Sequence, residues 1–269
     1  MYSSLIKNRR LKIVWRLLIS LLLLILAIAA MSEIGPDFNY KWHWNRVWRY
    51  LGHWSSGSFI AGPFLKGIWI TIAISCVGFG ISILSGLAAA AFRLSAWPLC
   101  MMSAKTYIAI WRNTPLLLQL FAAYFLIAPI FKLGPFWTAA IALGLFEGAY
   151  FAEIFRAGIL SVSKGQWEAS LSLGLNLKQS FISVILPQAV KNILPPMAGQ
   201  TVSILKDSTL VSAIAVADLT MQSQVIVAES FLAFEVWLLV AAIYLSLALF
   251  ISFPAIVVEK RILSKRRTL

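Results

Sequence analysis

Long runs of apolar residues recur along the chain, separated by shorter segments that carry most of its charges. A membrane-spanning helix needs about 20 predominantly apolar residues, and six stretches approach or exceed this length. The expected spans cover residues 17–32, 67–92, 115–131, 136–155, 197–219 and 234–258. This pattern predicts an all-α polytopic membrane protein.

The composition agrees with a membrane protein and excludes several other classes. Of the 269 residues, 60% are hydrophobic and only 12% are charged, whereas soluble domains are about 25% charged. The net charge of +13 therefore does not indicate a nucleic-acid-binding domain, and no nucleic acid is expected as a partner. Membrane lipid is the expected surrounding.

The distribution of lysine and arginine predicts the orientation of the spans. With the amino end inside, 17 of the 23 basic residues lie on the cytoplasmic side, five lie outside, and Lys206 falls within a span. Cytoplasmic loops carry the excess of basic residues in membrane proteins. Both termini and the loop 157–196 are therefore predicted to be cytoplasmic.

Residues 1–32 are predicted to form a basic N terminus and the first span. A secretory signal cleaved after Ala29 is the alternative, since basic residues precede an apolar run that ends in small residues. The uncleaved span is favoured because a polytopic chain needs no removable signal.

Residues 33–66 concentrate tryptophan and tyrosine among lysines and arginines. Such rings gather at the headgroup level of a membrane. The segment is predicted to lie as a helix or loop on the outer, periplasmic surface. Stacking on RNA is the alternative, and it is not favoured outside the membrane.

Patterns typical of catalytic or metal sites do not occur in the sequence. His43 and His53 have no nearby carboxylate or thiol, and Cys76 and Cys100 have no partner at metal-ligand spacing. The motifs G-x-x-x-x-G-K-[ST], G-x-S-x-G and H-E-x-x-H are missing. We expect no enzyme activity, metal or cofactor in this chain, so an energy-converting domain must belong to another chain.

The loop 157–196 has the pattern of two short helices joined by a sharp corner. Ser163 begins an S-x-x-Q capping box, and Asn176 begins a second one with asparagine as the cap. Gly174 lies between them, where one helix must end in a left-handed residue. An interfacial amphipathic hairpin without a partner is the alternative, but paired caps and a tight corner favour a rigid knob presented to a cytoplasmic protein.

Prolines mark the far side of this loop. Pro187 predicts a stop or bend in the second helix, and Pro195-Pro196 restrict the approach to the fifth span, which is expected to begin near Met197.

Residues of this loop resemble a known signature. Glu168-Ala169-Ser170, Gly174, Val184 and Leu186-Pro187 resemble the E-A-A-x3-G-x9-I-x-L-P signature of permease subunits of bacterial ABC importers. The spacing is intact over 20 residues, with serine for the second alanine and valine for isoleucine. Residues 111–121 (WRNTPLLLQLF), 149–159 (AYFAEIFRAGI) and 205–212 (LKDSTLVS) are similar to the polar amino-acid branch of that family.

The resemblance covers roughly residues 64–260 and implies a type I importer. Its transmembrane type-1 domain would span 67–258 as a five-helix core with one extra N-terminal helix, followed by a basic tail at 259–269. Implied partners are two ATPase chains holding ATP and Mg, a second permease chain that is identical or paralogous, and a periplasmic or lipid-anchored amino-acid-binding protein. The implied location is the bacterial cytoplasmic (inner) membrane.

In this family the E-A-A helix fits a groove on the ATPase. The resemblance therefore implies a coupling surface at Gln166, Trp167, Glu168, Ala169, Ser170, Leu173, Gly174, Leu186 and Pro187. A rigid helix at this place would transmit closure of the ATPase pair to the spans.

Charged residues within the spans are candidates for a substrate pathway, because charges at bilayer depth are costly and usually functional. Glu147, Lys206 and Asp207 lie at similar depths, and a carboxylate and a lysine would match the ammonium and carboxylate of an amino acid. A break in span five at Lys206-Asp207-Ser208-Thr209, capped by the hydroxyls, is the alternative.

Other polar residues have two open interpretations. Glu153 and Arg156 are expected to pair on one helix face, with a structural role or one in the pathway. Gln119 and Gln200 are candidates for interhelical hydrogen bonds or for substrate contact.

Two other function classes are alternatives for a polytopic chain of this kind. An ion-coupled secondary amino-acid transporter would need internal repeats and no E-A-A loop, and a membrane enzyme would need a catalytic cluster at the membrane surface. The sequence shows neither set of features.

Overall fold

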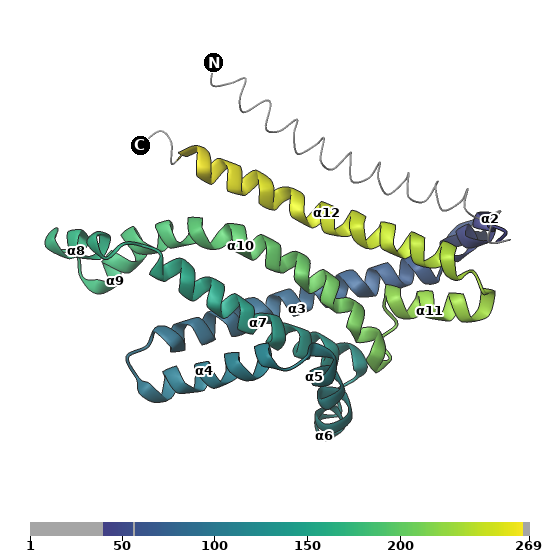
Figure 1. Ribbon diagram of the computed structural model, residues 1–269, viewed down its shortest axis with the longest axis horizontal. Coiled ribbons are helices and arrows are strands. Elements are labelled where there is room, and N and C mark those ends of the chain that lie inside the picture. Colours follow the sequence, from purple (N-terminus) through teal and green to yellow (C-terminus); the bar gives the residue numbers. More distant parts are fainter. Residues whose placement is uncertain (1–39, 56, 266–269) are drawn as a thin grey trace, which may run out of the picture. The chain divides into compact units, whose positions relative to one another are not determined.

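The computed structural model describes residues 40–55 and 57–265, so the first predicted span lies outside the described residues. The chain, whose helices Figure 1 labels, forms two compact units. One comprises the described residues up to Phe64 together with Ser223–Leu249, and the other begins at Leu65, ends at Gln222 and resumes at Phe250.

Helices make up most of both units. The long helices are α3 (Pro63–Leu94), α4 (Pro98–Asn113), α7 (Pro135–Leu160), α10 (Leu186–Asp207), α11 (Leu219–Ser230) and α12 (Ala233–Lys265). Between α4 and α7 lie α5 (Leu116–Ala122), a π-helical turn (Ala123–Ile127) and α6 (Ala128–Phe131). Between α10 and α11 the chain forms a 3-10 helix (Ser208–Ile214).

Three of these helices are long and apolar enough to cross a membrane by themselves: α3, α7 and the part of α12 up to Phe253. Two further pairs pass the same test but are bent at a short break, by 107° between α4 and Leu116–Phe131 and by 52° between Leu177–Ile214 and α11. The described part of the chain therefore has three to five candidate spans.

Glycines on α3 and α7 let these two helices pack closely in the second unit. A Cβ atom on Gly86 of α3 would lie 2.7 Å from the Cβ of Phe151 on α7. Conversely, a Cβ on Gly148 of α7 would overlap the hydroxyl of Ser85 on α3. Small residues allow helix backbones to approach closely in lipid, so α3 packs tightly against α7 at these positions.

The predicted bounds of the fifth span are wrong. Helix α10 starts before Pro195-Pro196, continues through both prolines and ends at Asp207. The fixed φ of proline is itself helical, and neighbouring groups satisfy the carbonyls that proline leaves free in membrane helices. The alternative of a break at Lys206–Thr209 is wrong, because only the winding changes there, from α-helical to 3-10, and the bend comes after Ile214. The hydroxyls of Ser208 and Thr209 donate back to the carbonyls of Leu205 and Lys206 and cap no new helix.

The loop predicted at 157–196 contains α8 (Lys164–Ser172) and α9 (Leu177–Ser180), followed by a π-helical turn (Phe181–Ile185) that leads into α10. The Asn176 capping box is confirmed, with both of its hydrogen bonds at 2.9 Å. The Ser163 capping box is wrong, because the amide of Gln166 donates to the backbone oxygen of Ser163 and the Gln166 side chain accepts from Gln188. Pro187 lies in the first turn of α10, just after the change from π-helical to α-helical winding.

The first unit contains an element that the sequence did not predict. After α2 (Trp44–Val47) and a 3-10 turn (Trp48–Tyr50), strands β1 (Gly52–Ser55) and β2 (Ser58–Ala61) pair antiparallel, with Trp54 opposite Phe59. In the same unit, Tyr40 and the amide of His43 donate to the fully buried carboxylate of Glu235, at 2.5 and 2.8 Å. These bonds fix residues 40–43, which precede α2, to the start of α12.

Candidate functional site: a cavity and a coupling end

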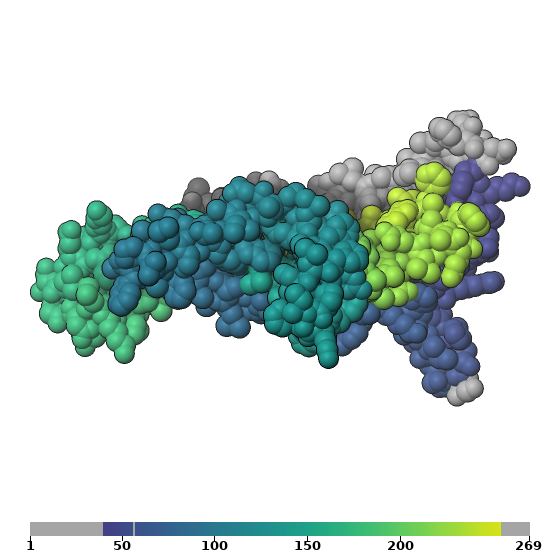
Figure 2. Space-filling view, turned by 90° about the horizontal axis from the view of Figure 1, so that it is seen from below, coloured from purple at the N-terminus to yellow at the C-terminus, as the bar shows by residue number. Residues whose placement is uncertain are grey.

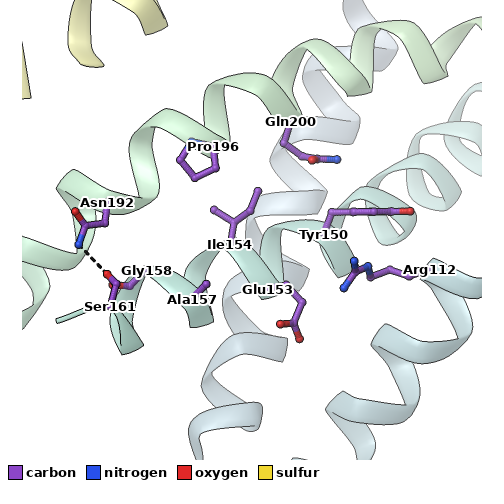
Figure 3. Close-up of a pocket in the computed structure, with 10 residues that line it drawn as sticks. All are labelled: Arg112, Tyr150, Glu153, Ile154, Ala157, Gly158, Ser161, Asn192, Pro196 and Gln200. Atoms are coloured by element: carbon purple, nitrogen blue, oxygen red, sulfur yellow. Dashed lines mark hydrogen bonds between the residues drawn. The ribbon is translucent and has the colours of Figure 1, made fainter. Parts of the chain in front are cut away.

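A cavity of about 390 Å³ lies between α4, α7 and α10 in the second unit (Figure 3). This volume is at the low end of the roughly 300–1,000 Å³ typical of small-molecule sites. Its lining residues are Arg112, Tyr150, Glu153, Ile154, Ala157, Gly158, Ser161, Asn192, Pro196 and Gln200.

One end of the cavity is closed where α7 and α10 touch. A Cβ on Gly158 would overlap the side chain of Ile193, so only glycine permits this approach. Next to it, Asn192 donates to the hydroxyl of Ser161 at 2.7 Å, as the dashed line in Figure 3 shows. Polar side chains thus face the cavity even where the two helices meet.

The wall formed by α7 and α4 is charged. Glu153 accepts from Arg156 at 2.8 Å, which confirms the predicted pair, and it also lies 3.7 Å from Arg93. The guanidinium of Arg112 lies 5.0 Å from the centre of the Tyr150 ring, the geometry of a cation–π contact. Among the lining residues, this wall therefore presents one guanidinium, Arg112, and one carboxylate, Glu153, which is already paired with arginines outside the lining.

Glu147 is fully buried beside the opposite end of the cavity. Gln200, which lines the cavity, donates to one of its carboxylate oxygens, and the other oxygen has no hydrogen-bond partner among the described residues. Asp207 is near enough to be a hydrogen-bonding and electrostatic neighbour of this carboxyl group, although its geometry falls short of a hydrogen bond to the unpartnered oxygen. Buried charges need partners, so a site with a free carboxylate oxygen fits a cationic group.

The structure separates the sequence candidates for the pathway into two sets. Glu147, Asp207 and Gln200 come together, with Glu153 on the cavity wall. Lys206 is exposed. Gln119 instead donates to the carbonyl oxygens of Trp111 and Thr114, at 3.0 and 3.1 Å, and so ties α4 to α5.

Several cavity residues were missed by the sequence reasoning. Tyr150, Ile154, Ala157 and Ser161 recur at helical spacing on α7, and Asn192, Pro196 and Gln200 recur every fourth residue on α10. Residues spaced in this way share one helix face, so the spacing was a signal that two polar faces oppose each other. Nothing in the sequence signalled that Arg112 reaches them from α4.

Helices α8 and α9, the predicted coupling helices, form one end of the second unit, which Figure 2 shows as green atoms. The backbone of Gly174 between them is left-handed, with φ +83°, as predicted. The ring of Trp167 stacks on Phe181 at 6.3 Å, and Gln188 donates to Gln166 at 3.1 Å. These contacts tie α8 to the chain that leads into α10.

The predicted coupling residues differ in exposure. Leu173 is 82% exposed although it is apolar, and Gln166, Glu168, Ala169, Gly174 and Pro187 are also exposed. Trp167 and Leu186 are half-buried and Ser170 is buried. The exposed members, Leu173 among them, are available to a partner, while Trp167 packs on Phe181 and holds the corner together.

Residues 82–264 match the family described as "Binding-protein-dependent transport system inner membrane component". The chain is 36% identical to the glutamine transport system permease protein GlnP of Escherichia coli K12 over 225 residues, which are 82% of this chain and 98% of that protein. It is 33% identical to the probable glutamine ABC transporter permease protein GlnM of Bacillus subtilis over 200 residues, 74% of this chain and 93% of that one.

Solved structures are similar as well. A chain of an amino acid ABC transporter crystallised with histidines superposes with a TM-score of 0.69 at 36% identity and covers 74% of this chain and 94% of its own length. A chain of the MetNI methionine ABC transporter, at 17% identity and a TM-score of 0.62, shares the fold. The prediction that this chain is a permease subunit and no enzyme is confirmed, and the chain belongs to the binding-protein-dependent inner membrane component family of ABC importer permeases, among the amino-acid transporters.

Proposed function

We propose that the chain forms the translocation pathway of an ATP-driven importer of polar amino acids and that its substrate passes through the cavity between α4, α7 and α10. The observation that carries this proposal is the buried carboxylate of Glu147, which has one unpartnered oxygen and is joined to the cavity by Gln200. This oxygen is the proposed acceptor for the ammonium of the substrate, with Asp207 adding negative charge nearby.

The carboxylate of the substrate requires a cation. Lys206, the residue expected from the sequence, is exposed, and Arg112 lines the cavity itself. Both are proposed as contacts at successive points of the pathway. Glutamine is the first substrate to test, because two of the similar permeases are named for glutamine and others are named for cystine and arginine.

Coupling to the ATPase is proposed to occur at the α8–α9 corner. The exposed Leu173 and Glu168 would fit a groove on the partner, and the contacts of Trp167 with Phe181 would carry the force into α10. Because α10 bears Gln200 and Asp207, a movement of this helix would change the surroundings of Glu147.

The same proposal includes six spans with both termini in the cytoplasm and a location in the inner membrane. The assembly would hold two ATPase chains with their ATP and Mg, a second permease chain and an external binding protein. A cysteine at Arg49 should react with an impermeant thiol reagent from outside, and one at Ser163 only after the membrane is opened. The opposite labelling pattern would contradict this topology.

The test of function is glutamine uptake into proteoliposomes that contain the permease, its ATPase and its binding protein. We expect uptake that requires ATP inside, with half-saturation raised about tenfold or more in Glu147→Gln, equivalent to about 1.4 kcal/mol per factor of ten. Lys206→Met and Arg112→Met are expected to raise half-saturation by a smaller factor at equal complex yield. Uptake that is driven by an ion gradient without ATP would overturn the proposal in favour of a secondary transporter.

A further inference from the structure

The β1–β2 hairpin of the first unit presents apolar side chains that nothing in that unit covers. Trp54 is 76% exposed and Phe59 is 47% exposed, and they lie opposite each other across the two strands with their rings 5.7 Å apart. Ile60 on the other face of the hairpin is also exposed. A two-stranded hairpin is marginally stable in water by itself, so this one needs a surrounding that suits exposed rings.

We propose that the tryptophan and phenylalanine of this hairpin insert into the outer leaflet of the membrane and anchor the segment before α3. The 15 residues from Leu51 to Leu65 contain no Asp, Glu, Lys or Arg. The ribbon ends at Ala61, and α3, a candidate span, begins at Pro63. The hairpin is therefore joined by a single residue, Gly62, to a helix whose surroundings are lipid.

The dimensions of the hairpin fit an anchor at the interface and exclude a crossing. Each strand has four residues, which at about 3.3 Å per residue give a length of roughly 13 Å. The hydrocarbon core is about 30 Å thick. Since the outer edges of two short strands leave amide and carbonyl groups unpaired, the ribbon must stay where headgroups and water can satisfy them.

The charges around the hairpin agree with this position. Arg46 and Arg49 precede it, both exposed, and Lys66 follows it, also exposed. Cations next to aromatic rings suit the boundary between lipid phosphates and acyl chains. The external binding protein is the other occupant to consider, but the ribbon carries no Asp, Glu, Lys or Arg that could specify a protein partner by charge.

Tyr40, Trp42, Trp44 and Phe234 form a different cluster in the same unit. Tyr40 contacts both Trp42 and Phe234, and the rings of Trp42 and Trp44 stack at 5.8 Å. These rings pack against one another within the unit. The rings of Trp54 and Phe59, in contrast, contact each other across the two strands and are otherwise exposed. The inference therefore concerns the hairpin and does not extend to every tryptophan of the segment.

Spin labels on the full transporter complex test this inference. Cysteines are placed at Trp54, at Phe59 and, as the water-exposed control, at Arg49, in a chain whose Cys76 and Cys100 are replaced by alanine. The complex is reconstituted in vesicles of phosphatidylcholine and phosphatidylglycerol. Collisions with oxygen and with a water-soluble nickel chelate then report the depth of each label.

We expect oxygen collisions to dominate at positions 54 and 59 and nickel collisions to dominate at position 49. Dominant nickel collisions at all three positions would overturn the anchor. Shielding at 54 and 59 that arises only when the binding protein is added would overturn it too, in favour of a protein-docking surface. The depth measurement requires no transport activity, so a failure of the proposed function would leave its result readable.

Discussion

The α3–α7 interface and the coupling helices α8 and α9 belong to the same unit but are specified in different ways. At the interface, glycines let two long apolar helices meet at distances that no larger residue permits. In the coupling helices, Leu173 and most of its neighbours face outward, and only a few contacts such as Trp167 on Phe181 hold the corner. The first region is packed entirely by residues of this chain. The second region exposes residues that are suited to contact another protein.

This difference has a consequence for mutations. A side chain added to a filled interface must displace backbone, and such overpacking typically costs about 1–3 kcal/mol or more. A change in an exposed coupling residue leaves the fold intact and alters only what the surface can bind. Loss of protein and loss of coupling should therefore be separable by position.

The largest expected effect is a loss of folded protein caused by a substitution at the α3–α7 interface. Gly86→Val would place side-chain atoms against the backbone of α7, because the carbonyl oxygen of Gly148 lies only 3.0 Å from the position of a Cβ. We expect most of the monodisperse protein extracted in detergent to be lost. Gly80→Val on the same helix is the matched control, since a Cβ at Gly80 meets nothing within 4 Å. Equal yields of the two variants would contradict the packing described above.

The next effect is at the coupling corner. Gly174→Val is expected to abolish uptake at normal yield of complex, because valine does not readily adopt the left-handed conformation that this corner requires. Gly165→Val in α8 is the control, as its backbone is not left-handed and it faces open space. Glu168→Lys should have the same effect as Gly174→Val by reversing an exposed charge. Normal transport-coupled ATP hydrolysis in these two variants would remove α8 and α9 from coupling.

A smaller effect, on the half-saturation concentration for uptake, is expected at Gln200 on α10. Gln200→Leu removes the hydrogen bond to Glu147 and should raise the half-saturation concentration for uptake by about tenfold, or about 1.4 kcal/mol. Gly199→Ala, one residue away and facing open space, should leave it unchanged. Unaltered half-saturation in Gln200→Leu would separate Glu147 from the pathway.

The smallest expected effect is on the stability of the first unit at alkaline pH. Burial and the hydrogen bond to Glu235 raise the pKa of Tyr40 from its usual value of 10.0 to about 12. The folded state therefore favours the neutral phenol, and the stability this gives is complete below pH 10 and is lost as the pH rises toward 12. Tyr40→Phe should remove this alkaline component from thermal unfolding profiles. If the thermal unfolding of the parent protein and of Tyr40→Phe had the same pH dependence, the role assigned to Tyr40 would be refuted.

Features that depend on neighbouring residues were predictable from the sequence. The Asn176 capping box, the left-handed Gly174 and the Glu153–Arg156 pair all follow from local spacing. Local rules failed where tertiary contacts decide the outcome. Pro195-Pro196 did not end a helix because α10 is supported along its length, and the Ser163 box did not form because Gln188 binds the side chain of Gln166.

The candidate site was only partly predictable for the same reason. Glu147 and Gln200 are 53 positions apart, and only the packing of α7 on α10 brings them together. The hairpin at residues 52–61 was missed because its strands are four residues long and its aromatic residues were explained by the membrane surface. Short strands carry too few alternating positions to be distinguished from a loop.

The central claim is that the α8–α9 end receives the ATPase, and photocrosslinking within the assembled complex tests it most directly. A benzoylphenylalanine at Leu173, 82% exposed, is compared with one at Phe125, an exposed apolar residue in the π-helical turn between α5 and α6. The account predicts that light joins the ATPase chain to the permease from position 173 and not from position 125. Crosslinking from position 125 alone would contradict it.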